Sequence, residues 1–228
     1  MLTLLTTTGE RPEAWALCER WMQAQIYPGP VRWVVVDDGT IRQPITFYRK
    51  NWELVLVRPE LLWQPGMNTQ ATNILEGLAH IPADARLVVI EDDDYYAPRW
   101  LETVDAYLDT AELVGECRAR YYNVATRTFR QLQNAEHASL CSTAMKGSAL
   151  KLFEGVCSPG VKFIDINLWK GVPRKDKVLF VGTNVVGIKG MPGRTGIGMG
   201  HAKQFEGQRD TDGAVLQKWV GKDAEGYL

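Results

Sequence analysis

Hydrophobic residues in the first half of the chain fall into short continuous runs that alternate with helical spacings. The continuous runs, typical of strands buried on both faces, occupy residues 1–8, 31–36, 54–57 and 87–90. Apolar residues recur every three or four positions at 12–25, 68–80 and 98–111, which predicts helices with one buried face. This alternation predicts an α/β fold of Rossmann-like type, with a mostly parallel central sheet flanked by helices.

The second half of the chain is less regular. Residues 114–132 hold two β-prone runs, which predicts a hairpin that forms a smaller, acceptor-side region. Ser148 is expected to cap a short helix that includes Phe153. Glycines are dense between Gly187 and Gly213 and apolar residues are scattered there, so we expect a long loop that serves as a lid.

Length and composition favour one globular domain. The chain has 228 residues, 45% of them hydrophobic, which is enough for one sizeable core. A net charge of −1, from 26 basic and 27 acidic residues, excludes a disordered chain and a strongly cationic nucleic-acid coat. We therefore expect a single domain over 1–228, in which 1–112 bind a nucleotide and 113–228 shape the rest of the site.

The chain carries no signal for a membrane or a secreted location. No apolar run approaches the ~20 residues of a membrane span, and the first residues form a strand rather than a signal peptide. The cysteines are far apart and form no C-x-x-C pair, so neither a zinc site nor a disulfide framework is indicated. We expect a cytoplasmic protein with reduced, buried thiols; its oligomeric state is open.

Four consecutive acids, Glu91, Asp92, Asp93 and Asp94, follow the buried run at 87–90. Ligands of open α/β sheets collect beyond the carboxyl ends of the strands, so these carboxylates are expected to face a crevice. Packed carboxylates repel one another, and a divalent cation is the simplest compensator. Mg²⁺ and Mn²⁺ prefer oxygen ligands and share them with phosphates, which predicts a diphosphate as co-ligand. The alternative is a solvated acidic turn before the next helix.

A second acidic pair, Asp37 and Asp38, also follows a buried run. A carboxylate at this place accepts hydrogen bonds from a base or a ribose in other nucleotide-binding sheets. Asp-Gly is also a turn signature, so a simple Asx turn explains the pair without any ligand. With both acidic pairs on one sheet, we expect one pair to hold the nucleoside and the other the metal and diphosphate.

Taken in order, the motifs resemble those of the GT-A glycosyltransferases, most closely the family 2 group of inverting enzymes. The resemblance covers roughly the first 170 residues and rests on TTTGERPE, VVVDDGT, GMNTQATNILEG, VVIEDDDYYAP and FIDINLWK. It implies a GT-A fold, a nucleoside diphosphate sugar as donor, with UDP-sugar favoured, and Mn²⁺ or Mg²⁺ as cofactor. The activity it implies is transfer of a hexose or a related sugar to an acceptor hydroxyl.

The family's motifs also imply roles for individual residues. The nucleotide contacts are expected from Thr6, Asp37, Asp38 and Asp92. Asp93 corresponds to the principal metal ligand of the D-x-D motif. The chain departs from the family by Glu91 and by the extra Asp94, so both are further candidates for the metal.

Asp165 corresponds to the family's catalytic acidic residue, in a segment where Ile164 replaces the usual first acid. A carboxylate there accepts the proton of the acceptor hydroxyl while the nucleoside diphosphate departs, which gives direct displacement with inversion. The alternative is that Asp165 only caps the short helix that contains Trp169.

His201 follows a glycine-rich run inside the expected lid. Many GT-A enzymes use a histidine near the carboxyl end as a further metal ligand, and lid closure would bring this one over the substrate. Arg194, Lys189 and Lys203 are placed to neutralise a diphosphate. The alternative for all four is an ordinary solvated loop residue.

A metal-dependent, inverting glycosyltransferase is the function that these features favour. A sugar-nucleotide-forming nucleotidyltransferase remains an alternative, although the segment Thr7–Arg11 lacks the glycine density of such enzymes. A catalytically silent nucleotide- or carbohydrate-binding module is another alternative.

The acceptor stays open among a soluble glycan, a protein, a small molecule and modified DNA. The chain's size suits virus-encoded transferases that act on hydroxymethylated bases of DNA. Four arginines of the expected hairpin would form a phosphate-contacting strip for such an acceptor: Arg118, Arg120, Arg127 and Arg130.

Overall fold

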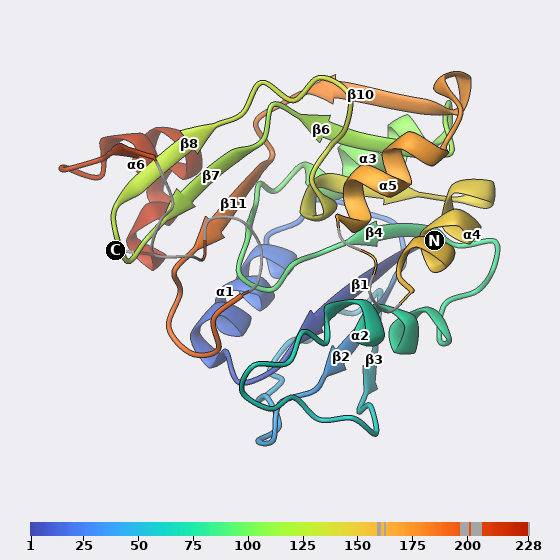
Figure 1. Ribbon diagram of the computed structural model, residues 1–228, viewed down its shortest axis with the longest axis horizontal. Coiled ribbons are helices and arrows are strands. Elements are labelled where there is room, and N and C mark those ends of the chain that lie inside the picture. Colours follow the sequence, from blue (N-terminus) through green and yellow to red (C-terminus); the bar gives the residue numbers. More distant parts are fainter. Residues whose placement is uncertain (159–160, 162, 197–200, 202–206, 228) are drawn as a thin grey trace.

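The computed structural model describes residues 1–158, 161, 163–196, 201 and 207–227, and its strands there form two sheets (Figure 1). The larger sheet has the order β10 (Lys177–Val181), β6 (Leu113–Cys117), β9 (Thr143–Met145), β4 (Arg86–Val89), β1 (Leu2–Thr8), β2 (Val31–Asp37), β3 (Trp52–Val57). The smaller sheet has the order β12 (Gln208–Arg209), β8 (Thr128–Gln131), β7 (Arg120–Asn123), β11 (Val185–Lys189), β5 (Tyr95–Tyr96).

The larger sheet is mostly parallel, as expected. β1 pairs in parallel with β2 and β4, β2 with β3, and β6 with β10, whereas β9 runs antiparallel to both its neighbours. The sequence analysis did not predict β9 or β10, which are short strands of three and five residues that pair with distant parts of the chain. The predicted α/β fold with a mostly parallel central sheet is confirmed.

Helices cover both faces of the larger sheet. They are α1 (Pro12–Gln23), α2 (Gln70–Leu78), α3 (Trp100–Leu108), α4 (Gly147–Val156), α5 (Ile164–Gly171) and, beside the smaller sheet, α6 (Ala214–Val220). One core packs α1 and α3 against side chains such as Trp33 and Val88. The other packs α2, α4 and α5 against the opposite face, with Val34 and Val89. Neighbouring strand residues alternate between these two cores, as the pleat requires.

Three local predictions for the second half need correction. The hairpin is β7 and β8 alone, while the first part of the predicted 114–132 range is β6, an internal strand of the larger sheet. Ser148 lies inside α4, and its backbone N–H and hydroxyl both donate to Glu112 rather than capping the helix. The expected loop from Gly187 begins inside β11, which is buried between β5 and β7.

Two further predictions concern thiols and membranes. All four cysteines are free and buried, as expected: Cys18, Cys117, Cys141 and Cys157. Among the described residues, no helix has the length and apolar character that crossing a bilayer requires.

Candidate functional site

The carboxyl ends of β1, β2 and β4 meet at one edge of the larger sheet. Thr8, the last residue of β1, lies opposite Asp37 of β2, and Leu5 lies opposite Val89 near the end of β4. The two acidic segments that follow β2 and β4 are therefore brought to the same edge. This is the place where ligands bind in open α/β sheets.

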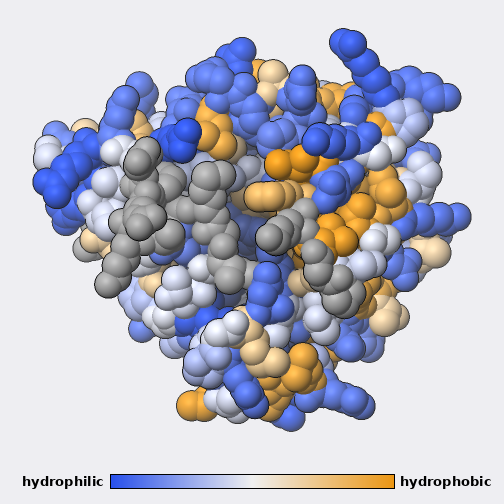
Figure 2. All heavy atoms as spheres, viewed as in Figure 1, coloured by the Kyte–Doolittle hydropathy of each residue, from blue (hydrophilic) through white to orange (hydrophobic). Residues whose placement is uncertain are grey.

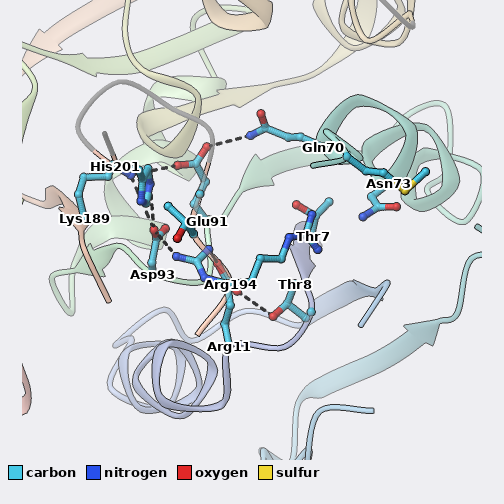
Figure 3. Close-up of a pocket in the computed structure, with 15 residues that line it drawn as sticks. Thr7, Thr8, Arg11, Gln70, Asn73, Glu91, Asp93, Lys189, Arg194 and His201 are labelled. Carbon is cyan, nitrogen blue, oxygen red and sulfur yellow. Dashed lines mark hydrogen bonds and ion pairs between the residues drawn. The ribbon is translucent and has the colours of Figure 1, made fainter. Parts of the chain in front are cut away.

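A cavity of about 120 Å³, here named the charged cavity, opens at this edge (Figure 3). Its polar lining comes from four stretches that are far apart in the sequence: Thr7, Thr8, Arg11, Gln70, Asn73, Glu91, Asp92, Asp93, Lys189, Arg194, Thr195 and His201. Three of the four expected acids of the 91–94 run thus face one cavity. The fourth, Asp94, lies behind them with no exposed surface.

Arg11 occupies the centre of the acidic cluster. Its Nη1 lies 2.6 Å from Asp92 Oδ1 and its Nη2 lies 2.6 Å from Asp93 Oδ2, so one guanidinium bridges two carboxylates. Thr8 Oγ1 donates a hydrogen bond of 2.7 Å to the other oxygen of Asp92. Arg11 comes directly before Pro12, the first residue of α1, and this fixed start of the helix holds the arginine over the end of β4.

Lys189 reaches the same cluster from β11. Its ammonium lies 3.2 Å from Asp94 Oδ1, and 3.9 Å from both Glu91 Oε2 and Asp93 Oδ2. The backbone N–H of Ile188 donates to the same Asp94 oxygen at 2.7 Å. Because Lys189 is only 5% exposed, its charge is compensated by these carboxylates rather than by water.

The four acids have different proton affinities. Burial raises the pKa of Glu91 well above its usual range, with the neighbouring Asp94 adding to the effect, and burial raises the pKa of Asp94 to about 6. Burial also raises the pKa of Asp92. Asp93 is the exception, because Arg11, Lys189 and His201 together outweigh its burial and hold its pKa below the usual range. Asp93 therefore carries the most firmly ionised carboxylate of the cluster.

His201 lies at the rim of the cluster. Its Nε2 is 3.5 Å from Asp93 Oδ2, and its side chain is 6% exposed. Burial, with the nearby Lys189, lowers the pKa of His201 to about 4, so the imidazole is neutral at pH 7. A neutral imidazole is the form that ligates metals. Lys203 and most of the glycine-rich run before His201 lie outside the described residues.

Asp38 is the centre of a second polar cluster beside the cavity. Its carboxylate accepts hydrogen bonds from Thr69 Oγ1 at 2.5 Å and Asn73 Nδ2 at 2.7 Å, and Arg194 Nη1 lies 2.5 Å away. The Arg194 guanidinium also lies over the ring of Trp63, 4.7 Å from its centroid. The carboxylate is fully buried, so these three donors take the place of water.

Of the four expected nucleotide contacts, only Asp92 lines the cavity; Asp37 and Thr6, like Asp38, lie outside its lining. Asp37 accepts hydrogen bonds from the backbone N–H groups of Gly39 and Gln43 and pairs with Arg58, which is the turn arrangement considered as its alternative. Thr6 is fully buried in β1, where its hydroxyl accepts from the indole N–H of Trp33 at 2.9 Å. The threonines that line the cavity are Thr7 and Thr8.

A second cavity of about 430 Å³, here named the Asp165 cavity, adjoins the first. Gln70, Glu91 and Lys189 line both cavities and separate one from the other. Asp165 lies in the first turn of α5, where its Oδ1 accepts a hydrogen bond from the N–H of Ile166 next to it. The Asp165 carboxylate thus lines a cavity, as the catalytic role requires, and it also lies at the start of a helix, as the capping alternative requires.

The walls of the Asp165 cavity are largely apolar. They include Leu132, Leu140, Ile164, Ile166, Val161 and Phe163. Phe163 is 67% exposed and has a φ of 58°, a left-handed conformation that is costly for a side chain with a Cβ. Figure 2 shows hydrophobic side chains gathered near the middle of one face, over the region of α5, in a surface that is otherwise mostly hydrophilic.

The expected arginine strip of the hairpin is interrupted. Arg118, Arg127 and Arg130 are exposed, but Arg120 is buried. Its guanidinium lies 3.7 Å from Glu116 and donates to the carbonyl oxygen of Val185. Arg120 therefore stabilises the smaller sheet and is not placed to contact phosphates at the surface.

Comparisons with known proteins relate this arrangement to solved structures. No protein-family model matches the chain, and no curated protein sequence matches it. The structure of S. aureus TarS superposes with a TM-score of 0.60 at 15% identity, over 82% of this chain and 37% of TarS. TarS 1-349 in complex with UDP-GlcNAc superposes with a TM-score of 0.58 at 14% identity, over 89% of this chain and 61% of that one. TarS 1-349 in complex with UDP gives 0.57 at 14% identity.

These likenesses concern the fold. The chain spans about two fifths of TarS and three fifths of its 1-349 fragment. The shared architecture is a GT-A-like α/β arrangement, in agreement with the fold that the sequence motifs implied.

Proposed function

We propose that this chain is a glycosyltransferase that moves a sugar from a nucleoside diphosphate donor to an acceptor hydroxyl. The observation that carries the proposal is that two cavities adjoin, one with paired cations and acids and the other with Asp165 in its wall. A nucleoside diphosphate needs cations beside it, and displacement at a sugar carbon needs a base on the opposite side of that carbon. The fold shared with a protein crystallised with UDP-GlcNAc and with UDP supports a UDP-sugar as donor.

The donor is assigned to the charged cavity, within residues 1–112 and the loop that carries Arg194. Asp38 is the expected partner of the nucleoside, and binding there exchanges the Arg194 guanidinium for a ligand group. The diphosphate is expected beside Arg11, Lys189 and Arg194, the three cations of the cavity lining. Thr7 and Thr8 take the role that the family's motifs gave to Thr6.

The acceptor is assigned to the Asp165 cavity, within residues 113–228. Its volume of about 430 Å³ lies in the range of small-molecule sites, which is about 300–1,000 Å³. Apolar walls and an exposed phenylalanine at the rim suit an acceptor that presents a flat ring face beside its hydroxyl. A small molecule and a base of nucleic acid both meet this description. The interrupted arginine strip supports the small molecule.

The reaction follows from the positions of these groups. Asp165 takes the proton of the acceptor hydroxyl while the hydroxyl oxygen bonds to the anomeric carbon. The bond between that carbon and the diphosphate oxygen breaks on the opposite side, so the sugar inverts its configuration. Lys189 lies where both cavities meet and stabilises the charge that develops on the departing nucleoside diphosphate.

The acidic cluster fits a divalent cation by two observations. Its four carboxylates outnumber the two cations that they face, Arg11 and Lys189. His201 is neutral and lies next to Asp93. We propose that Asp93 holds Mn²⁺ or Mg²⁺, with Glu91 and His201 as further ligands.

A bound cation would supply Lewis-acid stabilisation of the departing diphosphate. An alternative cluster consists of Glu91, Asp94 and Cys141, whose ligand atoms lie within 4.8 Å of one another. The Lys189 ammonium lies 3.2 Å from Asp94 and already compensates the charge of this cluster. We therefore place the cation on the side of Asp93 that faces the charged cavity.

A mass-spectrometric screen of nucleotide sugars tests the proposed function. The wild-type protein with Mn²⁺ should release a nucleoside diphosphate from one donor, and EDTA should reduce that release. Asp93→Ala should weaken donor binding, whereas Asp165→Asn should bind donor normally and lose turnover. Release of pyrophosphate from a nucleoside triphosphate would indicate a nucleotidyltransferase instead, and binding without turnover would indicate a silent module.

A further inference from the structure

Arg11 stands where a divalent cation would otherwise be expected. Its guanidinium is 11% exposed and touches one oxygen of Asp92 and one of Asp93, each at 2.6 Å. A planar guanidinium forms such forked contacts with carboxylates and with phosphates alike. The same side chain lines the charged cavity, so a ligand bound there lies within its reach.

We infer that Arg11 is a built-in competitor of the divalent cation for Asp93, and that it is released when the donor diphosphate takes its guanidinium. The inference rests on the proposed function and adds an order of events to it. Without donor, Arg11 holds the acidic cluster together and weakens cation binding. With donor, Arg11 exchanges two carboxylates for phosphate oxygens, and Asp93 becomes free for the cation.

Charge supports this competition. A cation on Asp93 would share the carboxylate that the Arg11 guanidinium contacts at 2.6 Å, so the two positive groups would be close neighbours. Two positive groups at such a distance repel strongly in a buried site. The contact between Arg11 and Asp93 therefore weakens the binding of a cation to Asp93.

Space supports the release of Arg11. The charged cavity measures about 120 Å³, well below the ~300 Å³ at the lower end of small-molecule sites. A nucleoside diphosphate enters only when a lining side chain moves. Arg11 is a long side chain directly over the acids, and the phosphate oxygens offer it the same forked contact that it leaves.

The other two cations of the cavity are in different positions. Lys189 contacts three acids, and the Asp94 oxygen nearest to it is also held by the backbone of β11, so Lys189 stays with the cluster. Arg194 pairs with Asp38 and Thr69 rather than with Asp92 or Asp93. Arg194 is therefore a matched control, because it carries the same charge in the same cavity without touching the cluster.

The experiment measures binding of Mn²⁺ alone, without nucleotide, by the electron paramagnetic resonance signal of the free ion. Arg11→Gln removes a positive neighbour of the ion and should bind Mn²⁺ about 10-fold more tightly than the wild-type protein. Arg11→Lys keeps the charge but cannot form the fork, and its affinity should lie between these two. Arg194→Gln should stay within about two-fold of the wild type, because it leaves the contacts of Asp93 intact.

Two results would overturn the inference. One is Mn²⁺ affinity in Arg11→Gln and Arg11→Lys that is no greater than in the wild type. The other is an equal gain of Mn²⁺ affinity in Arg194→Gln, which would show that any positive charge in the cavity weakens Mn²⁺ binding to the same degree. Neither result depends on turnover. If the wild-type protein transfers sugar but the Arg11 variants gain no Mn²⁺ affinity, the inference about Arg11 fails and the proposed function stands. If the Arg11 variants gain affinity but no sugar is transferred, the proposed function fails and the competition between Arg11 and the cation stands.

Discussion

The charged cavity and the Asp165 cavity are adjacent but differ in how fully their polar groups are paired. In and beside the first, Asp38 and Asp92 each have at least two partners within 2.7 Å. Asp93 has Arg11 at 2.6 Å, with His201 and Lys189 at 3.5 and 3.9 Å. In the second, Asp165 accepts only from the backbone of its own helix among the described residues, and the surrounding walls are largely apolar.

This difference indicates two kinds of recognition. The charges of the charged cavity are already compensated within the protein, so the proposed donor would bind there by exchanging partners. The Asp165 cavity is larger and its exposed lining is mainly apolar, so the proposed acceptor would bind there mainly by burying apolar surface, with the Asp165 carboxylate left for chemistry. Four substitutions test the comparison, from the largest expected effect to the smallest.

Asp165→Asn should have the largest effect. The amide cannot take a proton, and loss of a general base lowers turnover by about 10²–10⁴-fold. The affinity for UDP, measured by calorimetry, should stay at the wild-type value because the charged cavity is untouched. A turnover within a few-fold of the wild type would remove Asp165 from the mechanism.

Gly9→Ala should destabilise the charged cavity. Gly9 has a φ of 157°, and a Cβ at this position would lie 2.4 Å from Asp38 Oδ1 and 2.6 Å from the N atom of Gly39. We expect a loss of about 1–3 kcal/mol in the free energy of unfolding, measured by urea denaturation. Gly155→Ala is the control, since a Cβ there meets no atom within 4 Å. Equal stability of both variants would contradict the close packing of the Gly9 turn against Asp38.

Phe163→Gly should separate stability from acceptor binding. Glycine adopts a φ of 58° without strain, so the free energy of unfolding should rise by about 1 kcal/mol. Loss of the exposed ring should raise KM for the acceptor by several-fold, while hydrolysis of the donor in water is unchanged. An unchanged KM would show that the strained conformation of Phe163 is unrelated to the acceptor.

Asp210→Asn should have the smallest effect, in a segment that belongs to neither cavity. The Asp210 carboxylate accepts from the backbone N–H groups of Val215 and Leu216 at the start of α6. Burial raises the pKa of Asp210, but these hydrogen bonds outweigh it and hold the pKa below the usual range. The amide keeps one accepting oxygen but loses the negative charge that strengthens these bonds, which should cost about 1 kcal/mol at pH 7.

The pH dependence of this effect has a definite sign. A carboxyl whose pKa is lower in the folded protein stabilises it above the unfolded pKa of about 4 and loses that contribution as the pH falls below it. The stability difference between wild type and Asp210→Asn, from thermal melts at a series of pH values, should therefore shrink below pH 4. A difference that grows below pH 4 would contradict the assignment.

The first half of the fold and the acidic edge were predictable because their signals are local. The buried runs at 31–36 and 87–90 each end in acids, and parallel strands bring such ends together. The second half was predicted less well, since β9 and β10 are short strands of the larger sheet contributed from distant parts of the chain. Their pairing depends on tertiary contacts rather than on a pattern within each strand.

The partners of the acids could not be predicted from the sequence. Arg11 and Asp92 are 81 residues apart, and Lys189 and Asp94 are 95 residues apart. No periodicity links residues at such distances. Lys189 was a candidate for the diphosphate but its pairing with the acids was not expected, and Arg11 had no predicted role. Thr6, in contrast, had a predicted role but does not line the cavity. Side chains alternate along β1, and that of Thr6 contacts Trp33 instead.

A crystal grown with Mn²⁺ and UDP tests the central claim most directly, through the anomalous signal of manganese. The account predicts a manganese peak at Asp93 on the side of the charged cavity, with the diphosphate beside it and Arg11 turned from Asp93 to the phosphate oxygens. An acidic cluster without manganese, with Arg11 still bridging Asp92 and Asp93 and the nucleotide bound elsewhere, would contradict it.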